Sequence, residues 1–153
     1  MLKEERAKRQ DTTLESTGAE FLVLGHLLRE GVPTYKTYHN HPEYDLIATN
    51  PQKNLSVRIQ IKSRWATNSD NSFPIKKFGS EFIVFVALNC GYAFSKKNIE
   101  GGKKDCEIYV FPTELCKEYA RKDDWGKLAI KKIPDYLSYK FNWDLIKKKL
   151  KFI

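Results

Sequence analysis

Long apolar runs and paired cysteines are both missing from this chain of 153 residues. No stretch approaches the roughly 18 consecutive apolar residues of a membrane span, and the first residues, Met-Leu-Lys-Glu-Glu-Arg, lack the apolar segment of a secretory signal. We therefore expect a cytoplasmic protein that has no membrane partner. The three cysteines, Cys90, Cys106 and Cys116, show no CxxC spacing, so we expect reduced thiols rather than disulfides or a tetrahedral zinc site.

Internal repeats and low-complexity linkers that would divide the chain are also lacking. With 41% hydrophobic residues, the chain is long enough for one compact core and too short for two ordinary domains. Residues 1–153 are therefore predicted to form a single domain.

Acidic residues are outnumbered, since 19 Asp and Glu stand against 27 Lys and Arg and leave a net charge of +8. The basic clusters are Lys3 to Arg9, Lys76-Lys77, Lys96-Lys97, Lys103-Lys104, Lys131-Lys132 and Lys147 to Lys151. This balance favours a polyanionic partner such as nucleic acid, but lysine-rich surfaces are also common in soluble proteins. Charge alone leaves both alternatives open.

A first helix is predicted from about Thr13 to Glu30. Thr12 is suited to the N-cap position, with Glu15 three positions later, as in a capping box. Gly31 favours the left-handed conformation that ends many helices, and Pro33 prevents the helix from continuing.

Strand patterns occupy the middle of the chain. The clearest is Leu55 to Lys62, where apolar and polar residues alternate, and the almost wholly apolar Phe82 to Leu88 is typical of a strand covered on both faces. Shorter strands are expected at Tyr35 to Tyr38, Tyr44 to Ala48, Glu107 to Phe111 and Lys127 to Ile133, a hairpin loop at Thr49 to Asn54, a long loop at Arg64 to Glu81, and helices at Pro112 to Arg121 and Asn142 to Lys151. In the last helix we assign Trp143 and Leu150 to the core. This order predicts an α/β fold with a mixed four- to five-stranded sheet flanked by helices.

Glu20 is the unusual residue of the first helix. On a helical wheel it lies between Leu24 and Leu27, in an apolar arc, whereas Arg29 lies on the opposite side. A carboxylate in that arc is costly to desolvate unless a cation, hydrogen bonds or protonation offsets the cost. A structural ion pair and a functional role are both compatible with this placement.

Two polar residues, Gln60 and Lys62, are two positions apart on one predicted strand. Their side chains therefore leave the same face of the sheet, and Ile61 points into the core on the other face. Asp45 stands at the start of a neighbouring strand, before the apolar Leu46. Taken singly, Gln60 and Lys62 also fit an exposed sheet face, and Asp45 fits a turn or an N-cap.

Taken in order, Glu20, Asp45, Gln60 and Lys62 resemble the PD-(D/E)xK nuclease superfamily, in which a helix precedes a mixed sheet and the catalytic pair lies on adjoining strands. The segment Arg58 to Ser63 is similar to the signature strand, and the resemblance spans about residues 13 to 112. Two departures stand out. Gln60 replaces the usual acid, as in intron-encoded homing endonucleases of this superfamily, and Glu43-Tyr44-Asp45 replaces the Pro-Asp pair.

The resemblance implies a restriction-endonuclease-like core and Mg²⁺-dependent hydrolysis of DNA phosphodiester bonds, with Mn²⁺ as a substitute ion. Asp45, Glu20 and the main-chain carbonyl of Ile61 would be the oxygen ligands of the metal. Lys62 would lie against the scissile phosphate, and Gln60 would orient the water or complete the metal shell.

Double-stranded DNA is the implied partner. Its contacts are expected at Ser63, Arg64, Trp65, Lys76 and Lys77. Because one such site cuts one strand, a homo-oligomer, dimer or tetramer, is also expected. A homing or restriction enzyme, a Holliday-junction resolvase and a non-catalytic basic nucleic-acid-binding module all remain open.

Overall fold

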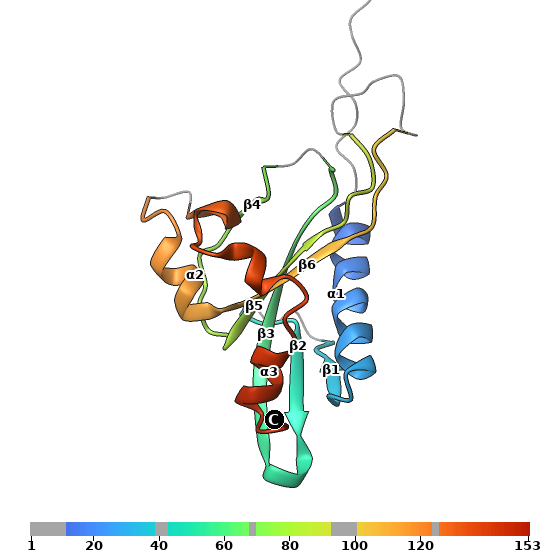
Figure 1. Cartoon of the computed structure of the whole chain (residues 1–153), viewed down its shortest axis with the longest axis vertical. Helices are drawn as coiled ribbons and strands as arrows, with labels where there is room; N and C mark the ends of the chain where they lie inside the picture. The colour runs from blue at the N-terminus through green and yellow to red at the C-terminus, as the bar shows by residue number, and fades with distance from the viewer. Residues whose placement is uncertain (1–11, 39–42, 68–69, 93–100, 124–125) are drawn as a thin grey trace, which may run out of the picture.

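The computed structural model describes residues 12–38, 43–67, 70–92, 101–123 and 126–153 (Figure 1). Its elements, in chain order, are α1 (Thr12–Arg29), β1 (Thr34–Lys36), β2 (Leu46–Asn50), η1 (Pro51–Lys53), β3 (Leu55–Arg64), β4 (Ser72–Pro74), β5 (Phe82–Ala87), β6 (Glu107–Pro112), α2 (Thr113–Tyr119), β7 (Lys127–Ala129), η2 (Ile130–Lys132), η3 (Tyr136–Tyr139) and α3 (Asp144–Lys149), where η marks a 3₁₀ turn. None of the helices within these ranges is long and apolar enough to cross a membrane. The basic clusters Lys3 to Arg9 and Lys96-Lys97 lie outside the described residues.

Five strands form one mixed sheet in the order β1-β2-β3-β5-β6. Strands β3 and β5 are parallel, with Lys62 opposite Phe85, whereas the other neighbours are antiparallel. The predicted α/β fold with a mixed sheet is therefore confirmed. β4 and β7 form a separate two-stranded sheet.

Two hydrophobic clusters cover the two faces of the large sheet. On one face, α1 and the C-terminal segment pack over Ile59, with Ile61 at the margin of the cluster. On the other face, α2 and the small sheet contribute to a second cluster, which includes Phe73. Strand β5 contributes to both clusters, since Val84 lies in the first and Phe85 in the second. All six residues of β5 are buried, as the apolar run predicts.

Helix α1 packs on the sheet through a narrow stripe. Ala19, Val23 and Leu27 recur every four residues and are completely buried, because this spacing keeps side chains on one side of a helix. The helix ends where predicted to within one residue, and Gly31 adopts a φ of +80°. The proposed N-cap position of Thr12 differs from the structure, in which Thr12 is already helical.

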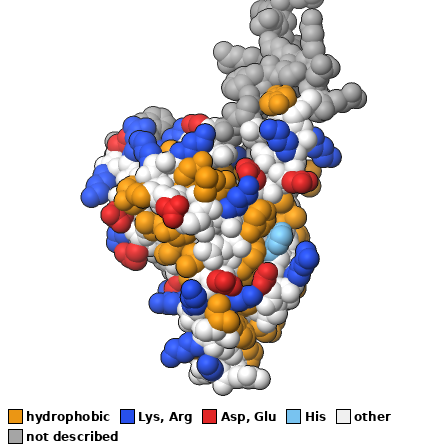
Figure 2. All heavy atoms as spheres, in the orientation of Figure 1, with side chains coloured by type: hydrophobic (Ala, Val, Ile, Leu, Met, Phe, Trp, Pro, Cys, Tyr) orange, Lys and Arg blue, Asp and Glu red, His pale blue; other side chains and the backbone are white. Residues whose placement is uncertain are grey.

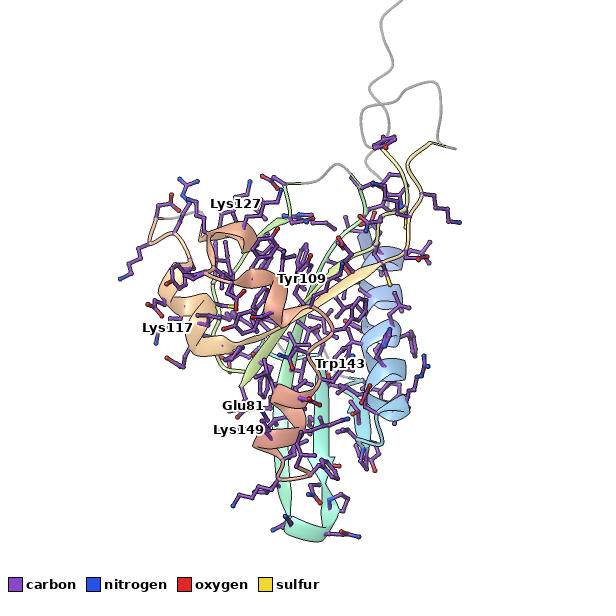
Figure 3. The ribbon with its side chains drawn as sticks, in the orientation of Figure 1. Glu81, Tyr109, Lys117, Lys127, Trp143 and Lys149 are labelled. Carbon is purple, nitrogen blue, oxygen red and sulfur yellow. The ribbon has the colours of Figure 1, made fainter. Side chains whose placement is uncertain are left out.

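The C-terminal segment completes the first cluster. Trp143 and Leu150 are buried in it, as predicted, and Trp143 stacks on His26 of α1 with ring centroids 5.5 Å apart (Figure 3). The buried Asn50 side chain donates a hydrogen bond to the Leu150 carbonyl at 2.8 Å. The last helix is shorter than predicted, since Lys151 has a φ of 59° that α-helix does not allow.

The expected long loop from Arg64 to Glu81 was wrong in part. Strand β3 continues to Arg64, and Ser72–Pro74 forms β4, which pairs with β7. The predicted strand from Lys127 to Ile133 likewise ends at Ala129. β4 and β7 are far apart in the sequence, so the local composition of either segment does not reveal their pairing.

Replacing Asn50 by Ala should destabilise the protein by about 1–3 kcal/mol, because the Leu150 carbonyl would lose its partner in a buried place. Lys53→Ala is the matched control, since Lys53 also donates at 2.8 Å to a C-terminal carbonyl, that of Lys151, but in an exposed position. Chemical denaturation of both variants measures the two changes. We expect the Lys53 variant to stay within about 0.5 kcal/mol of the unsubstituted protein, and equal losses would contradict the assignment.

Candidate active site

Asp45 is fixed by hydrogen bonds on two sides. Its N–H donates to the Ile59 carbonyl at 2.8 Å, and its own carbonyl accepts from the N–H and hydroxyl of Thr37, each at 3.0 Å. Leu46 also lies opposite Ile59, so two successive residues meet one residue of β3, as in a β-bulge. The Asp45 carboxylate accepts the Ile61 main-chain N–H at 2.7 Å and so occupies the place of a backbone acceptor.

Glu20 reaches the same place from α1. Its carboxylate forms an ion pair with Lys36 of β1 at 3.0 Å, and both side chains are about four-fifths buried. The cation required by the apolar position of Glu20 is therefore Lys36, which the sequence analysis did not identify as part of the site. The Lys36 ammonium also lies 4.7 Å from the centre of the Phe21 ring.

The carboxyl groups of Asp45 and Glu20 influence one another. Burial is the main cause that raises the pKa of Asp45 above its usual 3.8, and the charge of Glu20 and a hydrogen bond with its carboxyl raise it further. The Ile61 N–H and the charge of Lys62 act in the opposite direction. Two carboxyl groups that interact in this way favour either a shared proton or a bound cation.

Lys62 is the cation that lies near Asp45. Burial lowers the pKa of its ammonium and the charge of Arg64 lowers it further, whereas Asp45 opposes the change. Lys62 is therefore a partly desolvated cation, and a desolvated cation gains more from an anionic ligand than an exposed one does.

Gln60 and Lys62 line one hollow of about 240 Å³, together with Pro74, Lys76 and Lys77. We call this the β3 hollow. The shared lining confirms that the two side chains leave the same face, while Ile61 packs into the first cluster on the other face. Gln60 is only 8% exposed, and its Oε1 atom is a buried acceptor without a hydrogen-bond partner among the described residues. Such atoms are rare in folded proteins and point to a ligand or water.

These donors suit a hard divalent cation. No group of three or more His, Cys, Asp or Glu comes together within the described ranges. The candidate donors are instead two carboxylates, those of Asp45 and Glu20, and the unpaired amide oxygen of Gln60, all oxygen atoms of the kind that Mg²⁺ prefers. The Ile61 carbonyl stays a predicted ligand.

The predicted DNA contacts are distributed unevenly. Lys76 and Lys77 are exposed and line the β3 hollow. Arg64 does not line the β3 hollow, and its Nε donates a hydrogen bond to the Ser72 carbonyl of β4 at 2.6 Å. Ser63 and Trp65 are partly exposed at the end of β3 and just after it. A role in DNA binding stays a prediction for all five.

No protein-family model and no curated protein matches the sequence. The structure is similar to that of a bacterial homing endonuclease, I-Ssp6803I, with a TM-score of 0.57 over 91% of this chain and 95% of that chain. The fold is restriction-endonuclease-like. Only 19% of the residues are identical, so the likeness establishes the fold, and the resemblance seen in the sequence is confirmed at that level.

Asp45→Asn should stabilise the folded protein at pH 7.5 in EDTA. A raised pKa means that the folded chain binds the proton more tightly than the unfolded chain, so the stability that Asp45 contributes is present below its usual 3.8 and is lost as the pH rises through the folded pKa. The Asn side chain still accepts the Ile61 N–H and carries no charge.

Thermal unfolding checks this, with about 2–4 °C of added Tm expected for each kcal/mol of penalty removed. The gain should shrink as the pH approaches 4, and the exposed Asp135→Asn should show none. A variant less stable than the unsubstituted chain at both pH values would rule out the assigned electrostatics.

Proposed function

We propose that this protein is a Mg²⁺-dependent DNA endonuclease that hydrolyses phosphodiester bonds at specific sites in double-stranded DNA, as homing and restriction enzymes do. The observation that carries the proposal is the placement of the Asp45 carboxyl group, which interacts both with the Glu20 carboxyl group and with the partly buried Lys62. The likeness to a homing endonuclease supports this function, because the fold is shared along almost the full length of both chains.

Each residue of the candidate site has its own proposed role. Asp45, Glu20 and the Ile61 carbonyl would hold Mg²⁺, with the Gln60 amide orienting the water or completing the metal shell, and the ion supplies Lewis-acid chemistry at the phosphate when bound. Lys62 would place its ammonium against the scissile phosphate and stabilise the charge that develops there during attack. The hydrogen bond from the Ile61 N–H keeps the Asp45 carboxylate oriented through the reaction.

Double-strand cleavage needs two such sites. One Asp45–Lys62 pair acts on one strand, so we propose that the protein works as a symmetric homo-oligomer, a dimer or tetramer, whose symmetry relates two sites across the duplex. An active monomer would produce nicks instead.

Lys62→Ala should lower the cleavage rate by roughly a hundredfold or more, because the scissile phosphate loses its nearest cation. Plasmid nicking with Mg²⁺, with Mn²⁺ and with EDTA measures this loss, and DNA binding measured in EDTA should survive the change. Lys53→Ala removes the same charge from an exposed turn and serves as the control. Cleavage at the original rate by the Lys62 variant would eliminate the assigned site.

Gln60→Glu should lower the Mg²⁺ concentration needed for half-maximal cleavage, because it adds a negative charge to the donor set. Gln60→Ala should raise that concentration, since the donor oxygen is removed. Titration of nicking activity with Mg²⁺ compares the two variants. If both behave like the unsubstituted protein, Gln60 is not part of the metal shell.

The same assays separate the competing functions. A non-catalytic basic module with this fold would bind DNA in a salt-sensitive manner and give no product with any divalent ion. A Holliday-junction resolvase would cut four-way junctions in preference to linear duplexes. Site-specific cuts in linear duplex DNA are the result that the proposal requires.

A further inference from the structure

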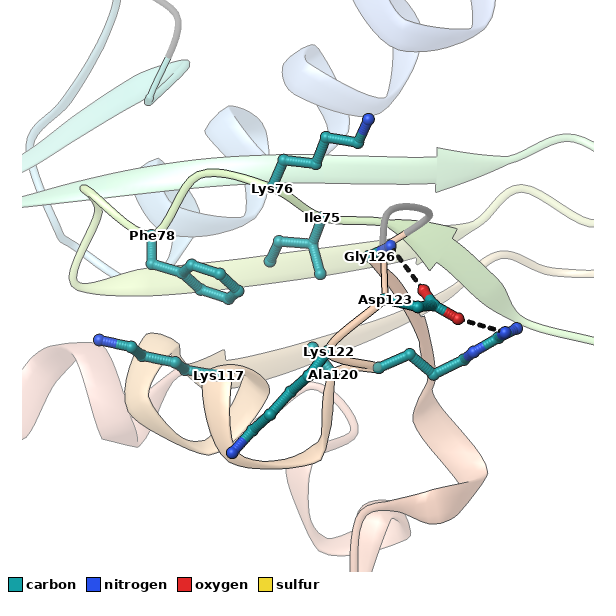
Figure 4. A pocket seen from close by; sticks show the side chains of 9 residues that line it. Ile75, Lys76, Phe78, Lys117, Ala120, Lys122, Asp123 and Gly126 are labelled. Carbon is teal, nitrogen blue, oxygen red and sulfur yellow. Dashed lines mark hydrogen bonds and ion pairs between the residues drawn. The ribbon is translucent and has the colours of Figure 1, made fainter.

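A second hollow adjoins the β3 hollow on the side of α2. Its volume is about 430 Å³, and it is lined by Ile75, Lys76, Phe78, Lys117, Ala120, Arg121, Lys122, Asp123 and Gly126 (Figure 4). We call it the α2 hollow. Lys76 lines both hollows, and in Figure 4 its side chain points away from Ile75 and Phe78, so the two hollows adjoin at the segment that carries Lys76.

The α2 hollow carries a clear excess of positive charge. Among the described residues, four cationic side chains line it against one carboxylate, that of Asp123, which pairs with Arg121 and accepts the Gly126 N–H. Lys117 and Lys122 stand across from Ile75 and Phe78 in Figure 4. Figure 2 shows Lys and Arg side chains gathered over this end of the molecule, with some Asp and Glu among them.

Two other hollows of the described surface are balanced in charge. One beside α3 is lined by Glu81 and Glu114 as well as by Lys148 and Lys149. Another beside β6 is lined by Asp105, Glu107, Lys104 and Lys140. Positive charge is therefore concentrated in the hollow that borders the candidate active site.

The backbone fixes the shape of the α2 hollow. The Ile75 N–H donates to the Gly126 carbonyl at 2.6 Å, and the Arg121 N–H donates to the Lys127 carbonyl at 3.0 Å. A Cβ atom at residue 126 would lie 2.5 Å from the Ile75 carbonyl oxygen, so only Gly allows this approach. The segment that carries Lys117 and Lys122 is thus held in place against the end of β4.

We propose that the α2 hollow binds the sugar–phosphate backbone of the DNA duplex beside the scissile phosphate, with Lys117 and Lys122 as the phosphate contacts. This assignment rests on the proposed function. A duplex carries one negative charge for about every 1.7 Å of its axis, so a duplex held at Lys62 continues over the surface next to the β3 hollow. Contacts of this kind set the position of the DNA and carry no sequence information.

The test compares two double variants that remove the same charge. Lys117→Ala with Lys122→Ala alters the α2 hollow, and Lys148→Ala with Lys149→Ala alters the balanced hollow beside α3; Figure 3 shows Lys117 on α2 and Lys149 on α3. All four lysines are exposed, so both variants should fold, which circular dichroism checks. Fluorescence anisotropy in EDTA then measures the affinity for labelled duplex DNA across a range of salt concentrations.

We expect the first variant to bind on the order of tenfold more weakly at about 150 mM salt, with a salt slope about 2 smaller, because each phosphate contact contributes about 0.9. The second variant should stay within about twofold of the unsubstituted protein. Cleavage at saturating DNA should keep its rate in the second variant, since Lys148 and Lys149 line neither the β3 hollow nor the α2 hollow.

Equal weakening in the two variants, or none in the first, would overturn the assignment. Binding in EDTA requires no chemistry, so the two proposals fail separately. Intact, Lys117-dependent binding without cleavage under any divalent ion would contradict the nuclease function and leave the α2 hollow as the duplex contact. An unsubstituted protein that does not bind duplex DNA would overturn both.

Discussion

One hydrogen bond, from the Ile61 main-chain N–H to the Asp45 carboxylate, ties together the two strands that carry the candidate site. The Ile61 side chain packs at the margin of the cluster under α1, so the core that holds Ile61 in place also holds the acid. The same cluster docks α1 on the sheet through Val23 and Leu27 and thereby brings Glu20 to Asp45. The geometry of the site is thus set by hydrophobic packing on one face of the sheet, whereas the Lys62 side chain leaves the other face.

Four charged groups follow one another in this arrangement, with the carboxyl groups of Glu20 and Asp45 between the ammonium groups of Lys36 and Lys62. Burial works against the charged form of both Asp45 and Lys62, and Glu20 adds to the cost at Asp45. Apolar residues at these positions would avoid the cost of burying charges, so this arrangement lowers the stability of the fold. Ionisable groups with perturbed pKa values of this kind are concentrated at functional sites in proteins, where a bound ligand provides the missing stabilisation.

Local periodicity was enough to place part of the candidate site. Alternation along β3 put Gln60 and Lys62 on one face, and the helical wheel showed that the Glu20 carboxylate needs a cation, hydrogen bonds or protonation to offset its desolvation. Neither pattern could reveal which cation, because Lys36 meets Glu20 through the packing of β1 against α1. The β4–β7 pairing and the α2 hollow were missed for a related reason. Both join segments distant in the sequence, such as Lys76 and Lys117, whose side chains share a wall only after the chain has folded.

The hydrogen bond between Asn50 and the Leu150 carbonyl bears on how the molecule is made. Strands β2 and β3 leave the ribosome early, but the part of their core that consists of Trp143, Ile146 and Leu150 is synthesised about a hundred residues later. Until then, Asn50 has no Leu150 carbonyl to bond, and the face of the sheet beneath the C-terminal segment stays open to water. A chain without its Trp143 to Leu150 segment therefore lacks part of the packing that holds the candidate site in place.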